Sequence, residues 1–163
     1  VRSGGSLIAV EGANGFFAGK DGFSLQRKSS DSDEDEDHED RLRRYADAER
    51  ESVVNFNAGA IYPLHMDPTH PLAFGYGEQY MSLKLGSTAY EFLENGWNVG
   101  VVMDGAPRSG FVGHKAQESI TQSLSYGVQS LGRGEIIYMV DNPFFRGFWH
   151  NGKLLISNAV FLL

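Results

Sequence analysis

The chain has 163 residues with 41% apolar and 12% aromatic side chains, which is enough to build one domain core and excludes wholesale disorder. Its net charge of −7 excludes nucleic acid and anionic membranes as expected partners, because both are bound through Lys and Arg. Residues 31–40 hold eight of the carboxylates, so the rest of the chain is near neutral. The absence of cysteine excludes thiol catalysis, disulfides and thiolate metal sites.

The N-terminal residues indicate a buried strand that follows a glycine turn. Residues 6–10 are an apolar run typical of a strand covered on both faces, and residues 11–15 form a loop at its carboxyl end. In open α/β sheets such loops are where ligands bind. The turn at Gly4 and Gly5 predicts a preceding helix upstream of Val1, so the sheet is expected to lack its N-terminal strands.

Residues 24–40 predict a mobile acidic insertion, because their most polar part cannot bury apolar surface. Alternating aspartates from Asp31 raise the alternative of a calcium loop. An EF-hand starting there needs Gly at its sixth position and Glu at its twelfth, and these positions hold Glu36 and Leu42. A solvated acidic loop is therefore favoured over a specific calcium site.

The remaining chain predicts alternating strands and short helices. A surface helix is expected over residues 39–54, where acidic residues precede arginines at i,i+4 spacing. A strand over residues 59–64 is expected to end at Pro63 or at the proline-rich turn 67–71. Further strands are expected at 79–85, 89–93, 98–103, 123–130 and 135–140, with helices at 115–121 and 153–163, the last of them buried.

Motifs for metal or nucleophilic chemistry are absent from the sequence. Neither His-Glu-x-x-His nor His-x-x-Glu occurs, and there is no Gly-x-Ser-x-Gly elbow or glycine-rich phosphate loop. His65, Asp67 and His70 are close enough in sequence to share a metal ion. The neighbouring prolines favour a turn in which these polar side chains bond the local backbone instead.

The most distinctive stretch is residues 132–149, where an apolar strand runs into Asp141, Asn142 and Pro143 and then into four aromatic residues around Arg146. Asp141 or Asn142 is expected to cap the turn, and Pro143 to stop the strand. The aromatic residues are expected to cover the end of the sheet. Arg146 is expected to stack on an aromatic ring or to bind a carboxylate, either that of Asp141 or that of a ligand.

Residues 3–9, 70–76 and 132–158 together resemble the C-terminal domain of large bacterial zinc carboxypeptidases of the Bacteroidetes type. The resemblance implies an α/β fold, a partial class I glutamine amidotransferase-like (flavodoxin-like) sheet with flanking helices, formed by residues 1–163 as one C-terminal accessory domain. It also implies a periplasmic or secreted location, and a zinc ion in an upstream peptidase domain of the same polypeptide. Amidotransferases of this class use a Cys and a His. The chain has no Cys, and Asp141, Asn142 and Pro143 occupy the loop of that His, so amidase chemistry is not expected.

Three functional hypotheses follow. The first is a non-catalytic accessory domain without cofactor, partnered by the upstream peptidase domain or by a second copy at an exposed sheet edge. The second is a small-molecule or carboxylate binding module, in which loops 11–14, 65–70 and 141–146 line one crevice at the carboxyl edge of the sheet. Its ligand-binding residues would be Asn14, His70, Asp141, Asn142 and Arg146. The third is a hydrolase in which His65, His70 or His114 contacts a serine and a carboxylate.

Overall fold

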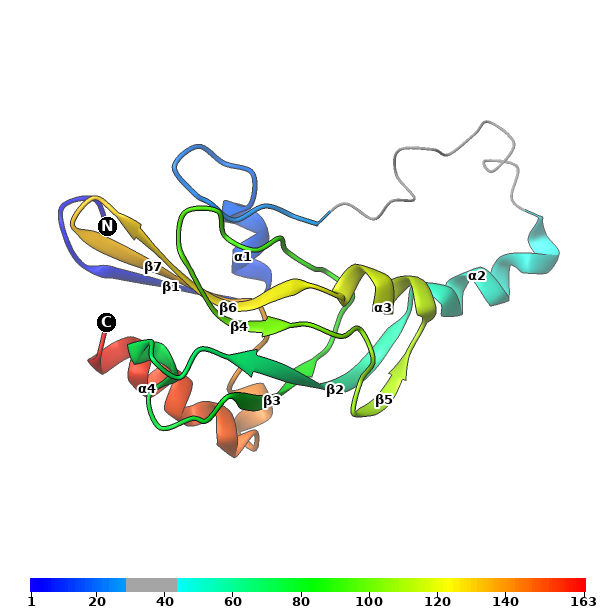
Figure 1. Cartoon of the computed structure of the whole chain (residues 1–163). Helices are drawn as coiled ribbons and strands as arrows, with labels where there is room; N and C mark the ends of the chain where they lie inside the picture. Colours follow the sequence, from blue (N-terminus) through cyan, green and yellow to red (C-terminus); the bar gives the residue numbers. More distant parts are fainter. Residues whose placement is uncertain (29–43) are drawn as a thin grey trace.

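The computed structural model describes residues 1–28 and 44–163, which form a curled seven-stranded sheet with flanking helices, a mixed α/β fold (Figure 1). The strand order is β1-β7-β6-β4-β2-β3, and β5 also pairs with β2. The strands are β1 (Ser6–Val10), β2 (Asn57–Met66), β3 (Gln79–Lys84), β4 (Trp97–Val102), β5 (Ser109–Val112), β6 (Ser123–Leu131) and β7 (Gly134–Met139). The helices are α1 (Gly12–Phe17), α2 (Ala48–Val54), α3 (His114–Ile120) and α4 (Lys153–Phe161), with 3-10 turns η1 (Tyr45–Asp47), η2 (Pro71–Ala73), η3 (Phe145–Gly147) and η4 (His150–Gly152).

Strand direction decides which loops lie at the same edge of the sheet. β1 and β7 pair in parallel, whereas β7 with β6, β6 with β4, and β4 with β2 are antiparallel. β2 therefore runs opposite to β1 and β7. The carboxyl ends of β1 and β7 meet at one edge, and the carboxyl end of β2 lies at the other.

β2 continues through Pro63 and ends at Met66, so of the two expected ends the turn at 67–71 is confirmed and Pro63 is not. Met66 N–H donates to Glu78 O, so the peptide groups of even-numbered residues of β2 point toward β3. Pro63 lies three residues before Met66 in the same register, opposite Met81, and so has the other direction. The ring nitrogen of Pro63 therefore points away from β3. On the side away from β3, β2 pairs with β5 up to Ile61 and with β4 from His65 onward. Pro63 lies between these two pairings, so its missing N–H removes no hydrogen bond between strands.

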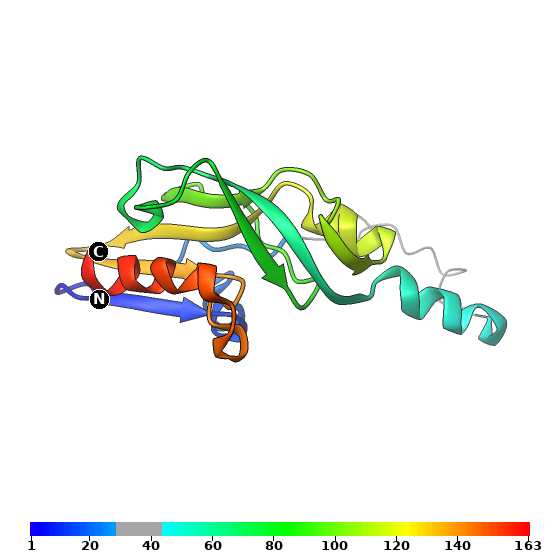
Figure 2. The same ribbon diagram turned by 90° about the horizontal axis from the view of Figure 1, so that it is seen from below.

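The sheet separates two apolar clusters, one on each face. One cluster contains Leu155 and Ala159 of α4 packed with Ile137 and Met139 of β7, and Figure 2 shows α4 lying along β1 and β7. The other cluster lies on the α1 side and includes Leu25, Tyr90, Leu93 and Tyr138. Helix α4 was expected to be buried, but only one face of it is, because Leu154, Val160 and Phe161 are exposed.

Most of the expected elements are present with shifted ends, and three differ. Residues 11–15 were expected to be a loop, but α1 begins at Gly12. No strand forms at 89–93 in the described chain, where Tyr90 makes only an isolated bridge with Arg27. β5 was not predicted, because its four residues carry no apolar alternation.

The first residues of the expected acidic insertion are packed. Leu25 is fully buried and Arg27 pairs with Tyr90, so residues 24–28 belong to the folded body. The rest of the insertion, the calcium alternative at Asp31 and the first part of the helix expected over 39–54 lie outside the described residues. From residue 45 onward this helix is present as η1 followed by α2.

Candidate functional site

A sharp turn joins β1 directly to α1 at the carboxyl edge of the parallel strand pair. Its residue, Glu11, has φ 49° and ψ −121°, a backbone conformation that ordinarily requires glycine. Holding another residue there costs about 1–3 kcal/mol, and such strain concentrates at functional sites. A strained strand-to-helix turn is also the backbone on which hydrolases present an exposed nucleophile. Here the exposed side chain is the carboxylate of Glu11.

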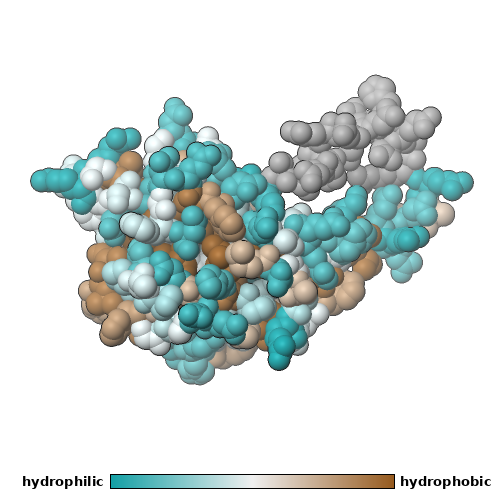
Figure 3. Space-filling view, in the orientation of Figure 1, coloured by the Kyte–Doolittle hydropathy of each residue, from teal (hydrophilic) through white to brown (hydrophobic). Residues whose placement is uncertain are grey.

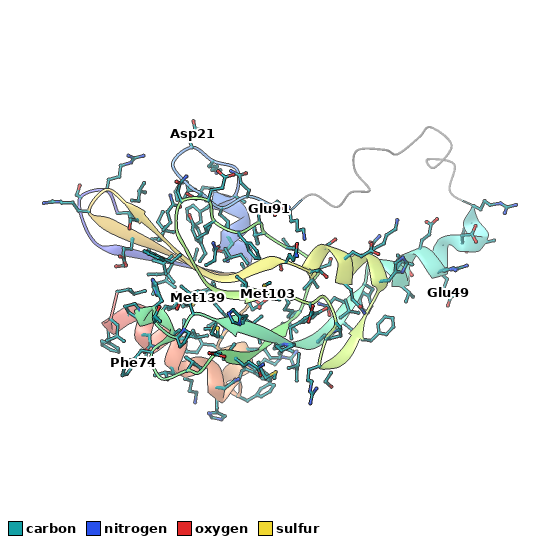
Figure 4. The ribbon with its side chains drawn as sticks, viewed as in Figure 1. Asp21, Glu49, Phe74, Glu91, Met103 and Met139 are labelled. Carbon is teal, nitrogen blue, oxygen red and sulfur yellow. The ribbon has the colours of Figure 1, made fainter. Side chains whose placement is uncertain are left out.

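Two asparagines tie this turn to the end of β7. Asn14 Nδ2 donates to Met139 O at 2.8 Å and to Glu11 O at 3.0 Å, while Asn142 Nδ2 donates to Glu11 Oε2 at 3.0 Å. Figure 4 labels Met139 at the carboxyl end of β7. Asn142 Oδ1 also accepts from Phe144 N–H at 2.9 Å, so the expected cap of this turn is confirmed. The structure thus brings Asn14 and Asn142 together around Glu11.

We expect Glu11→Gly to raise the free energy of unfolding by about 1 kcal/mol, because glycine adopts this backbone conformation without strain. Glu11→Ala is the matched control, since it removes the same carboxylate and keeps the Cβ atom. Urea unfolding monitored by tryptophan fluorescence compares the three proteins. Equal stabilities of the Gly and Ala variants would show that the turn stores no strain.

Behind this turn lies a buried ion pair. Lys84 Nζ is 2.7 Å from Asp141 Oδ1, and the two side chains are 2% and 5% exposed. Asp141 Oδ2 accepts from Ser82 Oγ at 2.8 Å, and Lys84 Nζ also donates to Ser125 Oγ at 3.3 Å. The pair therefore joins β3, β6 and the loop after β7. Of the two carboxylate partners considered for Arg146, Asp141 is excluded, because Lys84 binds it instead.

Two tyrosines border this network. Tyr126 OH lies 3.1 Å from Ser82 Oγ, and its pKa is raised by complete burial and further by Asp141. Tyr62 OH is buried and has no hydrogen-bond partner within the described chain. Burial, together with Asp141, raises the pKa of Tyr62 to about 12. Both phenols therefore stay protonated at neutral pH and are unsuited to act as general bases there.

We expect opposite results when each of these hydroxyls is removed. Tyr62→Phe should leave the free energy of unfolding unchanged or raise it slightly. The hydroxyl of Tyr62 loses its contact with water on folding and gains no hydrogen bond in return. Tyr126→Phe should lower the free energy of unfolding by about 1 kcal/mol, since it breaks the contact with Ser82. Thermal unfolding followed by circular dichroism tests the pair. An equal loss in both variants would indicate that Tyr62 has a partner.

His70 lies at the opposite edge of the sheet. It follows β2, and its Nδ1 accepts from Leu72 N–H at 3.1 Å, which caps η2. The expectation that loops 11–14, 65–70 and 141–146 line one crevice is therefore wrong, because β2 runs antiparallel to β1 and β7. Asp67 Oδ1 accepts from Thr69 N–H at 3.0 Å, so the expected turn with polar side chains bonding the local backbone is confirmed.

We expect His70 to make folding less favourable at acidic pH. Burial lowers its pKa below the usual value, against the smaller opposite effects of Asp67 and Glu135. As pH falls below about 6.5 the unfolded chain binds the proton first, so stability is lost with falling pH and is constant above this range. His70→Asn keeps a cap and cannot titrate. Urea unfolding between pH 5 and pH 8 should show a smaller pH dependence for this variant.

Arg146 stands apart from the other predicted site residues. It is exposed, has a left-handed backbone with φ 50°, and stacks on Phe145 with 5.1 Å between the guanidinium carbon and the ring centroid. Stacking on an aromatic ring, one of its two expected roles, is confirmed. The aromatic residues around Arg146 cover the end of the sheet only in part. Phe144 and Phe148 are exposed, whereas Trp149 Nε1 donates to Tyr80 OH at 3.3 Å.

Metal and hydrolase arrangements do not form within residues 1–28 and 44–163. No three His, Asp or Glu side chains gather there to hold a metal ion. His65, His70 and His114 make no hydrogen bond to a serine or a carboxylate in the same part of the chain. None of the described helices is long and apolar enough to cross a membrane.

Sequence reasoning missed Glu11 and Lys84. Glu11 was expected only as one residue of the loop 11–14, because no residue pattern reveals its strained backbone conformation. Lys84 had a signal: in β3 it shares one face with Tyr80 and Ser82, which marks it as facing inward. No family model, curated protein or solved structure matches this chain.

Proposed function

We propose that this chain is a non-catalytic, class I glutamine amidotransferase-like accessory domain of a secreted or periplasmic zinc metallocarboxypeptidase. The observation that carries the proposal is the strained turn at Glu11. A turn of this kind in an active enzyme presents a hydroxyl or a thiol. In this chain it presents a carboxylate held by Asn142, which supports an amidotransferase-like scaffold without its nucleophile.

The use of the neighbouring polar groups supports the same proposal. Asp141 is bonded to Lys84 and Ser82, and Asn142 to Glu11 and Phe144. These contacts satisfy the side chains from within the domain and rigidify the edge of the sheet. The alternative of a small-molecule or carboxylate binding module gains no support, because His70 and Asn142 lie at opposite edges.

The outer face of α4 supports docking against another domain. Large apolar residues are exposed there and on the adjoining turn, and Figure 3 shows apolar atoms gathered over this part of the surface. Contiguous exposed apolar surface commonly marks an interaction site. We name as the α4 patch Phe74, Leu154, Val160, Phe161 and Leu162. Its proposed partner is the upstream peptidase domain of the same polypeptide, which would also hold the zinc ion.

The proposal is tested first on the purified chain. After equilibration with zinc and gel filtration, mass spectrometry of metals should find far less than one zinc per chain. The chain should release neither C-terminal residues from peptides nor ammonia from glutamine. Stoichiometric zinc, or hydrolysis that elutes with the chain, would contradict a non-catalytic role.

Docking is tested with a separately produced peptidase domain of a carboxypeptidase of this type. The chain should bind it in calorimetry, and Phe161→Ser should weaken binding about tenfold, since exposed aromatics often anchor interfaces. Tyr45→Ser is the matched control, because Tyr45 is equally aromatic and 96% exposed but lies outside the α4 patch. Absence of binding, or equal effects of the two variants, would count against the proposed partner.

A further inference from the structure

Asn-Gly is a dipeptide whose backbone rearranges readily, because glycine has no side chain to shield its nitrogen. The glycine N attacks the side-chain carbonyl carbon, Cγ, of the asparagine. The new N–C bond closes a succinimide ring, and the side-chain nitrogen leaves as ammonia with the proton of the attacking N–H. Water then opens the ring at either carbonyl and gives aspartate or isoaspartate. The reaction therefore needs only water and a suitable geometry.

The chain contains this dipeptide three times, at residues 14–15, 95–96 and 151–152. The reaction makes two demands on the structure. The glycine N–H must be free of a hydrogen-bond partner, and the asparagine side chain must be free to turn toward it. Each hydrogen bond that has to break first slows the reaction. The three sites differ in these bonds, so the fold decides which of them reacts.

The first site, Asn14-Gly15, is held by α1. Asn14 is fully buried and donates two hydrogen bonds, to Glu11 O at 3.0 Å and to Met139 O at 2.8 Å. Both residues of the dipeptide lie inside α1, and closing the succinimide ring would require the helix to unwind there. The bonds that tie α1 to β7 therefore protect this asparagine.

The last site, Asn151-Gly152, has an exposed asparagine but is bonded on both sides of the reacting atoms. Asn151 Nδ2 donates to Met81 O at 3.1 Å, which holds the side chain away from the following peptide group. The N–H of Gly152 donates to Trp149 O at 3.2 Å, and Gly152 is buried. Exposure of the asparagine alone therefore does not free this site.

The middle site, Asn95-Gly96, lies just before β4 in the segment that joins β3 to β4 (Figure 1), and both residues are exposed. Ser24 Oγ donates to the backbone O of Asn95 at 3.3 Å. Within residues 1–28 and 44–163, the side chain of Asn95 and the N–H of Gly96 make no hydrogen bond. We propose that Asn95 is the site of spontaneous deamidation in the folded chain.

The product changes both the charge and the backbone of this turn. Deamidation adds a negative charge next to the exposed carboxylate of Glu94. Isoaspartate also adds one carbon atom to the main chain before Gly96. A Cβ atom at Gly96 would lie 2.6 Å from Val128 O, so Gly96 packs closely against β6. The extra atom therefore displaces Asn95 instead, which breaks its hydrogen bond with Ser24.

The test is incubation of the folded chain at mildly alkaline pH, followed by digestion and mass spectrometry of the three peptides. Conversion of amide to carboxylate at Asn95 should be about tenfold faster than at Asn14 or Asn151, because those two must first break hydrogen bonds. In concentrated urea the three sites should react at similar rates. Equal rates in the folded chain, or a lead for Asn95 that persists in urea, would overturn the proposal.

Two variants separate the chemistry from its consequence. Asn95→Gln keeps the amide but requires a larger ring, so conversion at this position should cease. Asn95→Asp carries the new charge without the extra backbone atom. The incubated chain, with its isoaspartate measured by enzymatic methylation, should have a Tm about 2–4 °C below that of fresh chain, since one hydrogen bond is lost. Asn95→Asp should match fresh chain, and an equal loss in this variant would overturn the backbone effect. These outcomes are independent of zinc binding and hydrolysis.

Discussion

Replacing Lys84 by Met should lower the free energy of unfolding by about 3–5 kcal/mol. The substitution keeps most of the side-chain volume but leaves the carboxylate of Asp141 buried without its counter-charge. Ser82 alone would remain as its hydrogen-bond donor, and one neutral donor does not offset the desolvation of a charge. Urea unfolding at neutral pH measures the loss, and we expect it to be the largest among single substitutions in this network.

A double variant separates the lost attraction from the stranded charge. Lys84→Met combined with Asp141→Leu should recover most of the stability, since an apolar pair of similar volume often replaces a buried ion pair without loss. Ser125→Ala provides a smaller reference, because it removes only the 3.3 Å contact with Lys84. If the double variant is as unstable as the single one, the loss comes from packing and not from charge.

Gly152→Ala should destabilise the fold by about 2–3 kcal/mol, because α4 would be displaced from the sheet. A Cβ atom at Gly152 would lie 2.1 Å from Pro143 O, and the neighbouring backbone atoms of Pro143 are also within 3 Å. These are backbone atoms that cannot rotate away. Moving them would disturb Leu155 and Ala159, which are buried in the core. Thermal unfolding should show the change as a lowered Tm.

Gly77→Ala is the matched control for this substitution. Nothing lies within 4 Å of a Cβ atom at Gly77, and its backbone is not left-handed. Its stability should be unchanged or slightly raised, because alanine restricts the unfolded chain. A comparable loss in both variants would mean that the contact between Gly152 and Pro143 is not what limits α4.

Much of the fold could be predicted because it depends on local pattern. The apolar run of β1 marked a buried strand, and β6 and β7 were readable as strands around the tight turn at Gly132. Helix α4 was found from apolar spacing, although the outward position of Phe161 was not. Where pattern was weak, as in β5 or around Tyr90, prediction failed, because the partner strand and not the local sequence decides whether an extended segment joins a sheet.

The residues of the candidate site were likewise predicted only in part. Sequence singled out Asn14, Asp141 and Asn142 as polar residues beside strand ends, and two of them meet at Glu11. It placed His70 with them, which the antiparallel direction of β2 prevents. The direction of a strand follows from how the chain returns through space, so residue spacing along the chain cannot reveal it.

The sequence by itself determined that this chain has no thiol, no recognised zinc motif and enough apolar residues for a folded domain, since these depend only on which residues are present. Tertiary structure alone decided that Lys84 pairs with Asp141, that Glu11 is held in a strained turn, and that β1 pairs in parallel with β7. Each of these three features depends on segments far apart in the chain, and their energies come from burial and direction in space.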